Sequence, residues 1–402
     1  MNLLSGRKRL QLAFLLGTLG ALGPLTIDMY LPAFPMIAQE LHSSASAVQL
    51  SLTACLLGLG LGQLVMGPLS DVHGRKKPLI IGLISFLLAS LLISFSPNIY
   101  FLIGVRFLQG FSAAAGIVIS RAIVRDMFSG RELTKFFSLL MLISNLAPIL
   151  APIAGAGVLS FTNWQGVFVL LAVIGLVLTS TIFIRFEETL PVAERVPSNI
   201  GQTLKNFKSL LTDRQFAGYA LAQGLMIAGV FAYVSGTPFV YQNVYGFSDT
   251  QFSFLFGING FGLIIGTQLV GRLSHVITEK TFLLIGLSQA FIVSTALVFA
   301  VLLNGPFISL AIPLFFFVMS IGIVSTSSFS LAMQTQGHIA GSASALLGLL
   351  PFLLGSITAP LVGIAGEQTA VPMGFIMFTT STLALLSYFG LARRGEKLRK
   401  AS

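Results

Sequence analysis

Twelve long apolar stretches, separated by short polar segments, make up most of this sequence. Their lengths, from 18 to about 27 residues, suit helices that cross a bilayer, which need about 20 mostly apolar residues. The strands of a membrane β-barrel are shorter and alternate between apolar and polar positions. We therefore predict an all-α membrane protein with twelve transmembrane helices. They are expected at Leu10–Met36, Ala47–Leu69, Leu79–Ser96, Ile99–Val124, Phe136–Leu159, Gln165–Phe186, Phe216–Tyr241, Phe252–Leu273, Phe282–Leu303, Ile308–Ala332, Ser342–Ala365 and Pro372–Leu391.

Basic residues are confined almost entirely to alternate polar segments, and the six other loops contain none. Because Lys and Arg accumulate on the cytoplasmic side of membrane proteins, this alternation predicts that both termini are cytoplasmic. It accounts for 21 of the 23 Lys and Arg residues: Arg7, Lys8, Arg9, Arg75, Lys76, Lys77, Arg125, Arg131, Lys135, Arg185, Arg195, Lys205, Lys208, Arg214, Arg272, Lys280, Arg393, Arg394, Lys397, Arg399 and Lys400.

The longest polar segment, Glu187–Arg214, divides six predicted helices from six. We predict an N-terminal six-helix bundle at 1–186, a cytoplasmic linker at 187–214 and a C-terminal six-helix bundle at 215–402. Within the linker, four apolar residues have helical spacing with lysines between them, namely Leu204, Phe207, Leu210 and Leu211. Either this segment is a short amphipathic helix on the inner membrane surface, or it is a plain linker.

Composition excludes several classes of protein. With 55% hydrophobic and 9% charged residues, a soluble domain would expose large apolar patches. The net charge of +10 suggests nucleic-acid binding, but the basic residues mark membrane orientation, so no nucleic-acid partner is expected. A single cysteine, Cys55, excludes an intrachain disulfide, and no metal site or cofactor is predicted, because the four histidines lie outside the apolar runs.

Two charged residues inside predicted helices are the best candidates for function, because charge in hydrocarbon is costly and usually marks a transport pathway. Asp28 and Arg106 are each expected roughly 10–12 Å below the outer surface, where they can pair directly if their helices face each other. We predict a protonation switch in which Arg106 approaches Asp28 in one conformation only. A static salt bridge, or an Asp28 side chain that reaches outer water, is the alternative.

The two halves of the sequence share short runs. Gly67-Pro68-Leu69-Ser70-Asp71 recurs as Gly271-Arg272-Leu273-Ser274-His275, and Leu31-Pro32-Ala33-Phe34 corresponds to Thr237-Pro238-Phe239-Val240. Two parallel six-helix repeats around a central site are the arrangement of major facilitator carriers. No phosphate-binding loop is present, so transport is expected to be passive or driven by an ion gradient. An enzyme is not expected.

The loop from Gly67 to Pro78 resembles the major facilitator signature G-x-L-x-D-x-x-G-R-[KR], with Val72 where the family often has a basic residue. By this resemblance, Asp71 and Arg75 with Asp126 would latch the inner helix ends together, and Gly67 and Gly74 permit a tight turn. The alternative is that these charges serve membrane orientation alone.

Two further runs resemble motifs of proton-coupled members of the superfamily. Arg106-Phe107-Leu108-Gln109-Gly110 resembles the R-x-x-Q-G motif. The run from Ala147 to Gly155, with Pro148, Pro152 and Gly155, resembles the antiporter motif of drug/proton exporters. Prolines kink helices and free carbonyl groups, and small residues let helices approach each other. Ordinary helix packing is the alternative reading of the second run.

The run Ile27-Asp28-Met29-Tyr30-Leu31-Pro32-Ala33-Phe34-Pro35 resembles the first helix of the Bcr/CflA drug exporters, the bicyclomycin and chloramphenicol resistance type. That resemblance implies proton-driven export of amphipathic antibiotics, with Asp28 and Arg106 as coupling residues. We expect a drug/proton antiporter that works by alternating access, as a monomer in the bacterial inner membrane. The alternative on the same fold is an exporter or importer of a native metabolite.

Five polar or half-polar residues within the helices are predicted to orient a substrate in an apolar cavity. The alternative for each is an ordinary hydrogen bond between helices. They are Tyr30, Asn145, Gln223, Tyr233 and Asn259.

Overall fold

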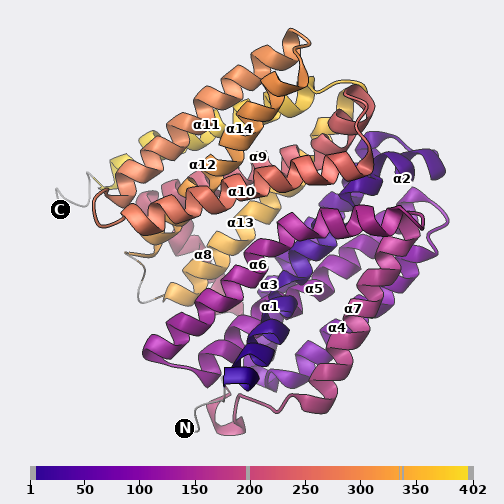
Figure 1. Cartoon of the computed structure of the whole chain (residues 1–402). Helices are drawn as coiled ribbons and strands as arrows, with labels where there is room; N and C mark the ends of the chain where they lie inside the picture. Colours follow the sequence, from indigo (N-terminus) through magenta and orange to yellow (C-terminus); the bar gives the residue numbers. More distant parts are fainter. Residues whose placement is uncertain (1–5, 196–199, 335, 337–338, 397–402) are drawn as a thin grey trace. The chain divides into compact units, whose positions relative to one another are not determined.

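The computed structural model (Figure 1) describes residues 6–195, 200–334, 336 and 339–396. Within these ranges the side chains of residues 6–8, 131, 134, 138, 141, 145, 200, 202–204 and 340 are not described. Several residues singled out above therefore lie outside the described residues, either entirely or by their side chains: Arg7, Lys8, Arg131, Asn145, Leu204, His338, Lys397, Arg399 and Lys400.

The described chain is helical, and twelve of its helical segments are long and apolar enough to cross a membrane, which confirms the predicted fold class. Short π-helical segments, Val240–Val244 and Tyr388–Ala392, extend two of the helices. The helices are α1 (Gly6–Asp28), α2 (Phe34–Glu40), α3 (Ala45–His73), α4 (Lys76–Ser94), α5 (Ile99–Met127), α6 (Gly130–Leu159), α7 (Trp164–Arg185), α8 (Ile200–Thr212), α9 (Arg214–Phe239), α10 (Asp249–Leu273), α11 (Glu279–Leu302), α12 (Phe307–Met333), α13 (Ala340–Leu361) and α14 (Val371–Ser387).

The chain folds into two compact units. Unit 1 contains Met1–Ile37 and Ala54–Ser198, and unit 2 contains Ala38–Thr53 and Asn199–Ser402. The unit boundary thus falls inside α3, whose first residues pack with α9 and α13: Gln49 Nε2 donates to the Ser235 carbonyl over 3.0 Å. The division into bundles at 1–186 and 215–402 stays a prediction.

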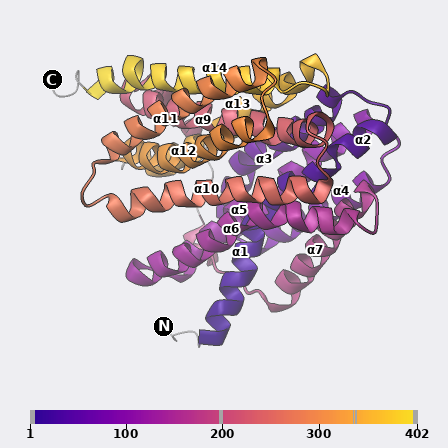
Figure 2. The ribbon, with the colours of Figure 1, turned by 45° about the horizontal axis from the view of Figure 1, so that its top comes forward.

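Four helix contacts of unit 1 have counterparts in unit 2 (Figures 1 and 2). In unit 1, α5 packs against α1 and α4, α1 packs against α6, and α4 packs against α7. In unit 2, α12 packs against α9 and α11, α9 packs against α13, and α11 packs against α14. Equivalent helices occur in the same order along the chain, as expected for the internal repeat seen in the sequence.

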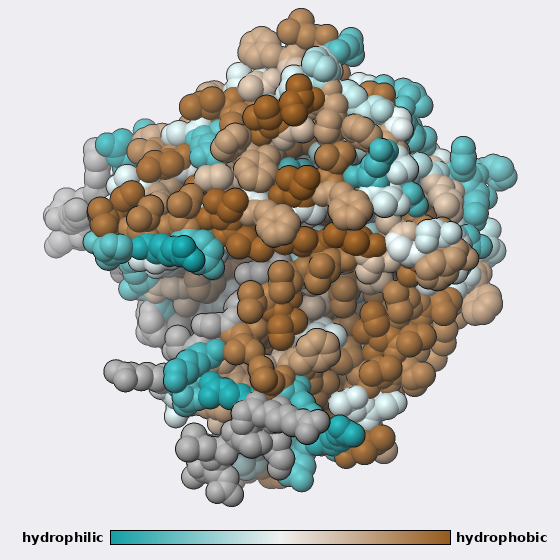
Figure 3. Space-filling model, in the orientation of Figure 1, coloured by the Kyte–Doolittle hydropathy of each residue, from teal (hydrophilic) through white to brown (hydrophobic). Residues whose placement is uncertain are grey.

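The outward faces of the helices are largely apolar. Large hydrophobic side chains such as Leu88, Val177 and Phe254 are exposed, and the visible face of the molecule is mostly hydrophobic (Figure 3). A surface of this kind is stable against lipid chains and not against water. The chain is therefore a multi-pass membrane protein.

The segment between the halves contains a helix, α8, as the spacing of its apolar residues indicated. Leu210 is fully buried, whereas Lys205 and Lys208 are exposed. The helix packs onto α9 and α13 within unit 2, and Asn206 Nδ2 donates to Ser342 Oγ over 3.1 Å. Its apolar face is thus partly covered by protein, while Leu211 stays exposed.

Candidate functional site

Asp28 lies at a break in the first membrane span, which runs from Arg9 to Glu40. Helix α1 ends at Asp28, a 3-10 turn follows at Leu31–Ala33, and α2 continues the span. Pro32 explains the break, because it lacks an N–H donor and disfavours helical geometry at the residue before it. The sequence predicted one helix over Leu10–Met36; the break instead places Asp28, a residue that is 5% exposed, at a helix end.

Arg106 on α5 is fully buried, and two aromatic rings cover its guanidinium. Its Cζ lies 4.1 Å from the ring centre of Tyr30 and 5.6 Å from that of Phe168. These are cation–π distances. Arg106 Nη1 also donates to Gln109 Oε1 over 2.6 Å, and Gln109 Nε2 donates to Ser90 Oγ on α4 over 2.8 Å. The spacing in R-x-x-Q-G therefore places arginine and glutamine on one helix face.

Asp28 and Arg106 form no ion pair in this structure, although α1 and α5 pack against each other. Neither residue takes part in an ion pair among the described residues. The direct contact that the sequence allowed is thus absent here, because Gln109 and the ring of Tyr30 hold the guanidinium. Arg106 Nε and Nη2 are buried without a hydrogen-bond acceptor, a costly state for a charged group.

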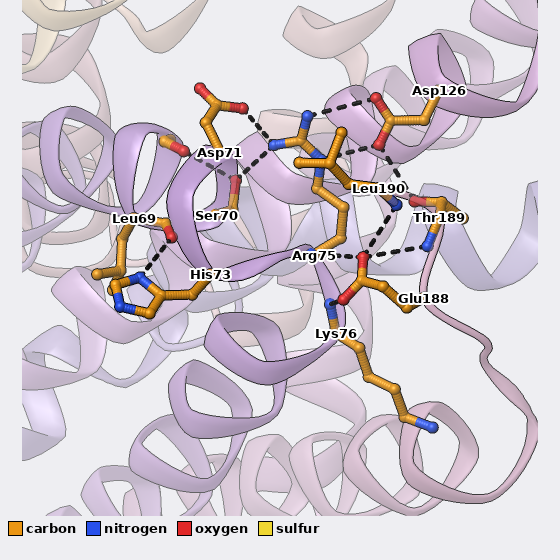
Figure 4. A network of polar contacts seen from close by, with 11 residues as sticks. Leu69, Ser70, Asp71, His73, Arg75, Lys76, Asp126, Glu188, Thr189 and Leu190 are labelled. Atoms are coloured by element: carbon orange, nitrogen blue, oxygen red, sulfur yellow. Dashed lines mark hydrogen bonds and ion pairs between the residues drawn. The ribbon is translucent and has the colours of Figure 1, made fainter. Parts of the chain in front are cut away.

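A second polar cluster surrounds Arg75, between α3 and α4 (Figure 4). Arg75 Nε donates to Asp126 Oδ2 on α5 over 2.8 Å, and Nη1 donates to Asp71 and to Ser70 Oγ. The structure therefore brings together Asp71, Arg75 and Asp126, the charged residues of the predicted latch. Gly74 has φ +86, a conformation that favours glycine.

Gly67, the other glycine of this predicted latch, is not closely packed. A Cβ at Gly67 would meet only Val118 Cγ1, at an ordinary contact distance of 3.4 Å. Its carbonyl accepts a hydrogen bond from Ser70 Oγ over 2.8 Å. The structure therefore ties Gly67 to the cluster through its carbonyl and not through close helix packing.

Glu188, in the segment after α7, completes the cluster. Its carboxylate accepts hydrogen bonds from the backbone N–H groups of Arg75 over 2.7 Å and of Lys76 over 3.1 Å, at the start of α4. Partial burial raises the pKa of this carboxyl, but the N–H groups of Arg75, Leu190 and Lys76 and the charge of Arg195 outweigh it. The pKa of Glu188 therefore lies below its usual range.

We expect Glu188→Gln to lower stability by no more than about 1 kcal/mol at pH 7, the usual contribution of a helix cap. Because the folded pKa of Glu188 is lower than its ordinary value of 4.5, the contribution is present above that pH and is lost as pH falls through the folded pKa. Thermal unfolding in detergent at pH 7 and below pH 4.5 measures this. Glu187→Gln, the neighbouring exposed acid, is the control; equal pH dependence in both variants would contradict the assignment.

Helix α6 carries the run that resembles the antiporter motif. Pro148 and Pro152 lie inside this helix, where each removes an N–H donor and leaves the carbonyl four residues earlier without its helical partner. Gly155 faces the break in the first span, and a Cβ at this position would lie 1.9 Å from the Met29 carbonyl oxygen. Only glycine lets the α6 backbone pack this closely beside Asp28.

Gly155→Ala is expected to lower stability by about 1–3 kcal/mol, because the new methyl group clashes with backbone that cannot move easily. Gly157→Ala on the same helix is the matched control, since an added Cβ there meets nothing within 4 Å, and it should be neutral or slightly stabilising. Thermal unfolding of the two purified variants makes the comparison. Equal melting temperatures would contradict the close packing of α6 on the α1 break.

Of the three predicted cavity residues of unit 2, Tyr233 and Asn259 contact each other. Asn259 Nδ2 on α10 donates to the hydroxyl of Tyr233 on α9 over 2.9 Å, and the Tyr233 ring stacks on Phe256. Gln223 is buried, and its Oε1 has no hydrogen-bond donor among the described residues. The contacts of Tyr233 and Asn259 favour the alternative, an ordinary hydrogen bond between helices. A role of these two residues, or of Tyr30 and Gln223, in a substrate cavity stays a prediction.

A family profile described as the Major Facilitator Superfamily matches residues 16–360. The chain belongs to the major facilitator superfamily. This assignment agrees with the signature loop from Gly67 to Pro78, where Arg75 and Asp71 meet Asp126. The fold and the family are those of transporters, which carry small molecules through a membrane.

Two curated relatives extend over nearly the full length of this superfamily member. One is an uncharacterized MFS-type transporter of Bacillus subtilis, YdgK, which is 55% identical over 97% of both chains. Another is a bicyclomycin resistance protein homolog of Haemophilus influenzae, which is 33% identical over 96% of both chains. The resemblance to drug-resistance transporters is thus confirmed at the level of the family.

Solved structures of superfamily members share this fold. The crystal structure of a bacterial homolog of the human lysosomal transporter Spinster matches with a TM-score of 0.78 over 98% of both chains. Its sequence is 14% identical, so the match concerns the architecture alone.

Several residues around these sites did not stand out in the sequence. Phe168 on α7 and Ser90 on α4 contact the Arg106 group across helices, and Glu188 lies 113 residues from Arg75. Only the contact of Gln109 with Arg106 could be predicted from the sequence, because the two residues lie one helical turn apart in a motif of the superfamily. The other contacts depend on long-range packing.

Proposed function

We propose that this chain is a proton-coupled exporter of amphipathic antibiotics, which exchanges drug for protons by alternating access. It would act in the inner membrane of a bacterium with both termini in the cytoplasm, as the distribution of basic residues predicts. The observation that carries the proposal is the buried carboxyl of Asp28 at the α1 break, in a span that also places Tyr30 on Arg106. The relative named for bicyclomycin resistance supplies the substrate class.

The coupling step would use the two unpartnered donors of Arg106. In one conformation Gln109 and Tyr30 hold the guanidinium, and the Asp28 carboxyl carries a proton. In the other, Arg106 Nε and Nη2 would bind the Asp28 carboxylate, and the proton would leave to the opposite side. A carboxylate that binds arginine gives up its proton readily, so alternation between these two contacts would couple proton entry to the change of shape.

Movement at the basic helix ends would accompany this cycle. Arg75, at the start of α4, forms ion pairs with Asp71 at the end of α3 and with Asp126 at the end of α5. The cluster therefore holds the ends of these three helices of unit 1 together. We expect this cluster to stabilise one conformation of the carrier, as the superfamily signature implies. It would contribute to the rate of alternation and not to the proton site itself.

A susceptibility panel on a drug-sensitive bacterium that overproduces the protein tests the proposal. Cells with the wild-type chain should tolerate higher concentrations of bicyclomycin, chloramphenicol or another amphipathic antibiotic than cells with Asp28→Asn at equal protein level. Absence of protection across the panel would move the alternative ahead, namely an exporter or importer of a native metabolite. The 55% identical relative is named only as an uncharacterized transporter, so its name supports neither substrate class.

A further inference from the structure

A basic pocket lies at the start of α4, and it shares Glu188 with the Arg75 cluster. Its volume is about 460 Å³, and its polar lining includes three cationic side chains, Lys76, Lys77 and Arg195. Ile80 and Ile81 form an apolar wall on one side of it. The predicted transport cycle uses none of these side chains.

The positive charge of the pocket is only partly neutralised within it. Glu188 is the one acid in the lining. Its carboxylate interacts with the charge of Arg195 and also accepts from the backbone N–H groups of Arg75 and Lys76, so it offsets one of the three cations. Lys76 Nζ donates to the carbonyl of Phe183 over 3.2 Å, and Arg195 Nε is buried without an acceptor. His73, also in the lining, has a ring nitrogen 3.2 Å from the Leu69 carbonyl oxygen. The pocket therefore offers unused cationic donors to an anion.

The apolar wall continues along α4 beyond the pocket. Ile81, Ile84 and Leu88 are 53%, 42% and 54% exposed, and their spacing of three and four residues places them in one stripe on the helix. Over the seven residue steps from Ile81 to Leu88 the stripe extends roughly 10 Å along the helix into the apolar layer. A ligand that fits both the basic pocket and this apolar stripe carries a negatively charged head group and an apolar chain.

We propose that this pocket binds the phosphate of an anionic glycerophospholipid, with an acyl chain along Ile81, Ile84 and Leu88. Basic pockets beside transmembrane helices are suited to anionic headgroups. A free phosphate would satisfy Lys77 and Arg195 but would leave the isoleucine wall unused. A zwitterionic lipid would bring its own cation close to three others.

The corresponding place in unit 2 differs in charge. Helix α11, the equivalent of α4, begins with Glu279, whose carboxylate accepts hydrogen bonds from Ser330 and Gln334 at the end of α12. The adjacent Lys280 pairs with Glu396 over 2.8 Å. Paired charges of this kind do not select an anion, so the lipid site is assigned to unit 1.

Binding of phosphatidylglycerol to the full-length protein in detergent, counted by native mass spectrometry, tests the proposal without reference to transport. Removal of two of the three cations by Lys77→Gln with Arg195→Gln should weaken tight binding about 30-fold, at roughly fivefold for each basic side chain near an anionic lipid. The matched control, Lys205→Gln with Lys208→Gln, removes two exposed lysines of α8. It should bind as the wild type does.

Three results would overturn the proposal. The first is equal binding by the pocket variant and the α8 control, when both elute as single species with wild-type melting temperatures. The second is equal affinity for phosphatidylcholine. The third is full displacement of the lipid by millimolar inorganic phosphate, which would identify a free-phosphate site. A further variant, Ile81→Ser with Ile84→Ser, should also weaken lipid binding while leaving the cations in place.

Discussion

Export driven by a proton gradient is expected to fall by about 100-fold or more when Asp28 is replaced by asparagine. The amide has the shape of the carboxyl but cannot release a proton, so the exchange of drug for protons would stop. Folding should be largely unaffected, since Asp28 takes part in no ion pair among the residues that the structure describes. Accumulation of an exported antibiotic in everted membrane vesicles, with melting temperature measured in parallel, tests this.

Glu40→Gln is the matched control for this variant. Glu40 ends the same membrane span but is exposed, so its loss should leave gradient-driven accumulation near the wild-type level. An Asp28→Asn protein that still accumulates the antibiotic against its gradient at the normal rate would remove Asp28 from the coupling step. Equal loss of export in Asp28→Asn and Glu40→Gln would also contradict the assignment, because removal of either acid from this span would then be enough to stop export.

Arg106→Lys is expected to reduce coupled export by up to about 30-fold. A desolvated cation–π contact contributes up to about 2 kcal/mol, which corresponds to that factor, and the guanidinium of Arg106 lies 4.1 Å from the Tyr30 ring centre. Lysine keeps the charge but lacks the planar group that stacks on the ring while it donates to Gln109. The same vesicle assay, with binding of the antibiotic measured separately, makes the comparison.

Arg125→Lys provides the control on the same helix, because Arg125 is exposed near the end of α5. It should support normal export. If Arg106→Lys is equally active, a positive charge alone is sufficient at this position. The stacking of Arg106 on Tyr30 would then have no role in coupling.

The helices of this carrier could be predicted almost completely from the sequence, because each membrane span must be apolar along its length. The thin polar break at Ser96–Ile99, for example, does separate α4 from α5. The interruption of the first span was harder to see. Pro32 and Pro35 were visible, but prolines in a membrane span are common, and only the structure shows that α1 ends at Asp28.

The candidate sites were predictable where a motif is local. Asp71 and Arg75 are four residues apart on adjoining helix ends, and the structure brings them together with Asp126. Contacts between distant segments were not predictable in this way. Phe168 beneath Arg106 and Glu188 at the start of α4 depend on how α7 packs on α4, which no short stretch of sequence specifies.

Substrate-induced proton release measures the central claim, that Asp28 carries the exchanged proton. Everted vesicles that hold the protein would be energised, and their internal acidity followed with a pH-sensitive dye as an antibiotic from the susceptibility panel is added. We expect the antibiotic to dissipate the pH gradient in vesicles with the wild-type chain and to leave it unchanged in vesicles with Asp28→Asn. Equal dissipation in both would contradict this claim.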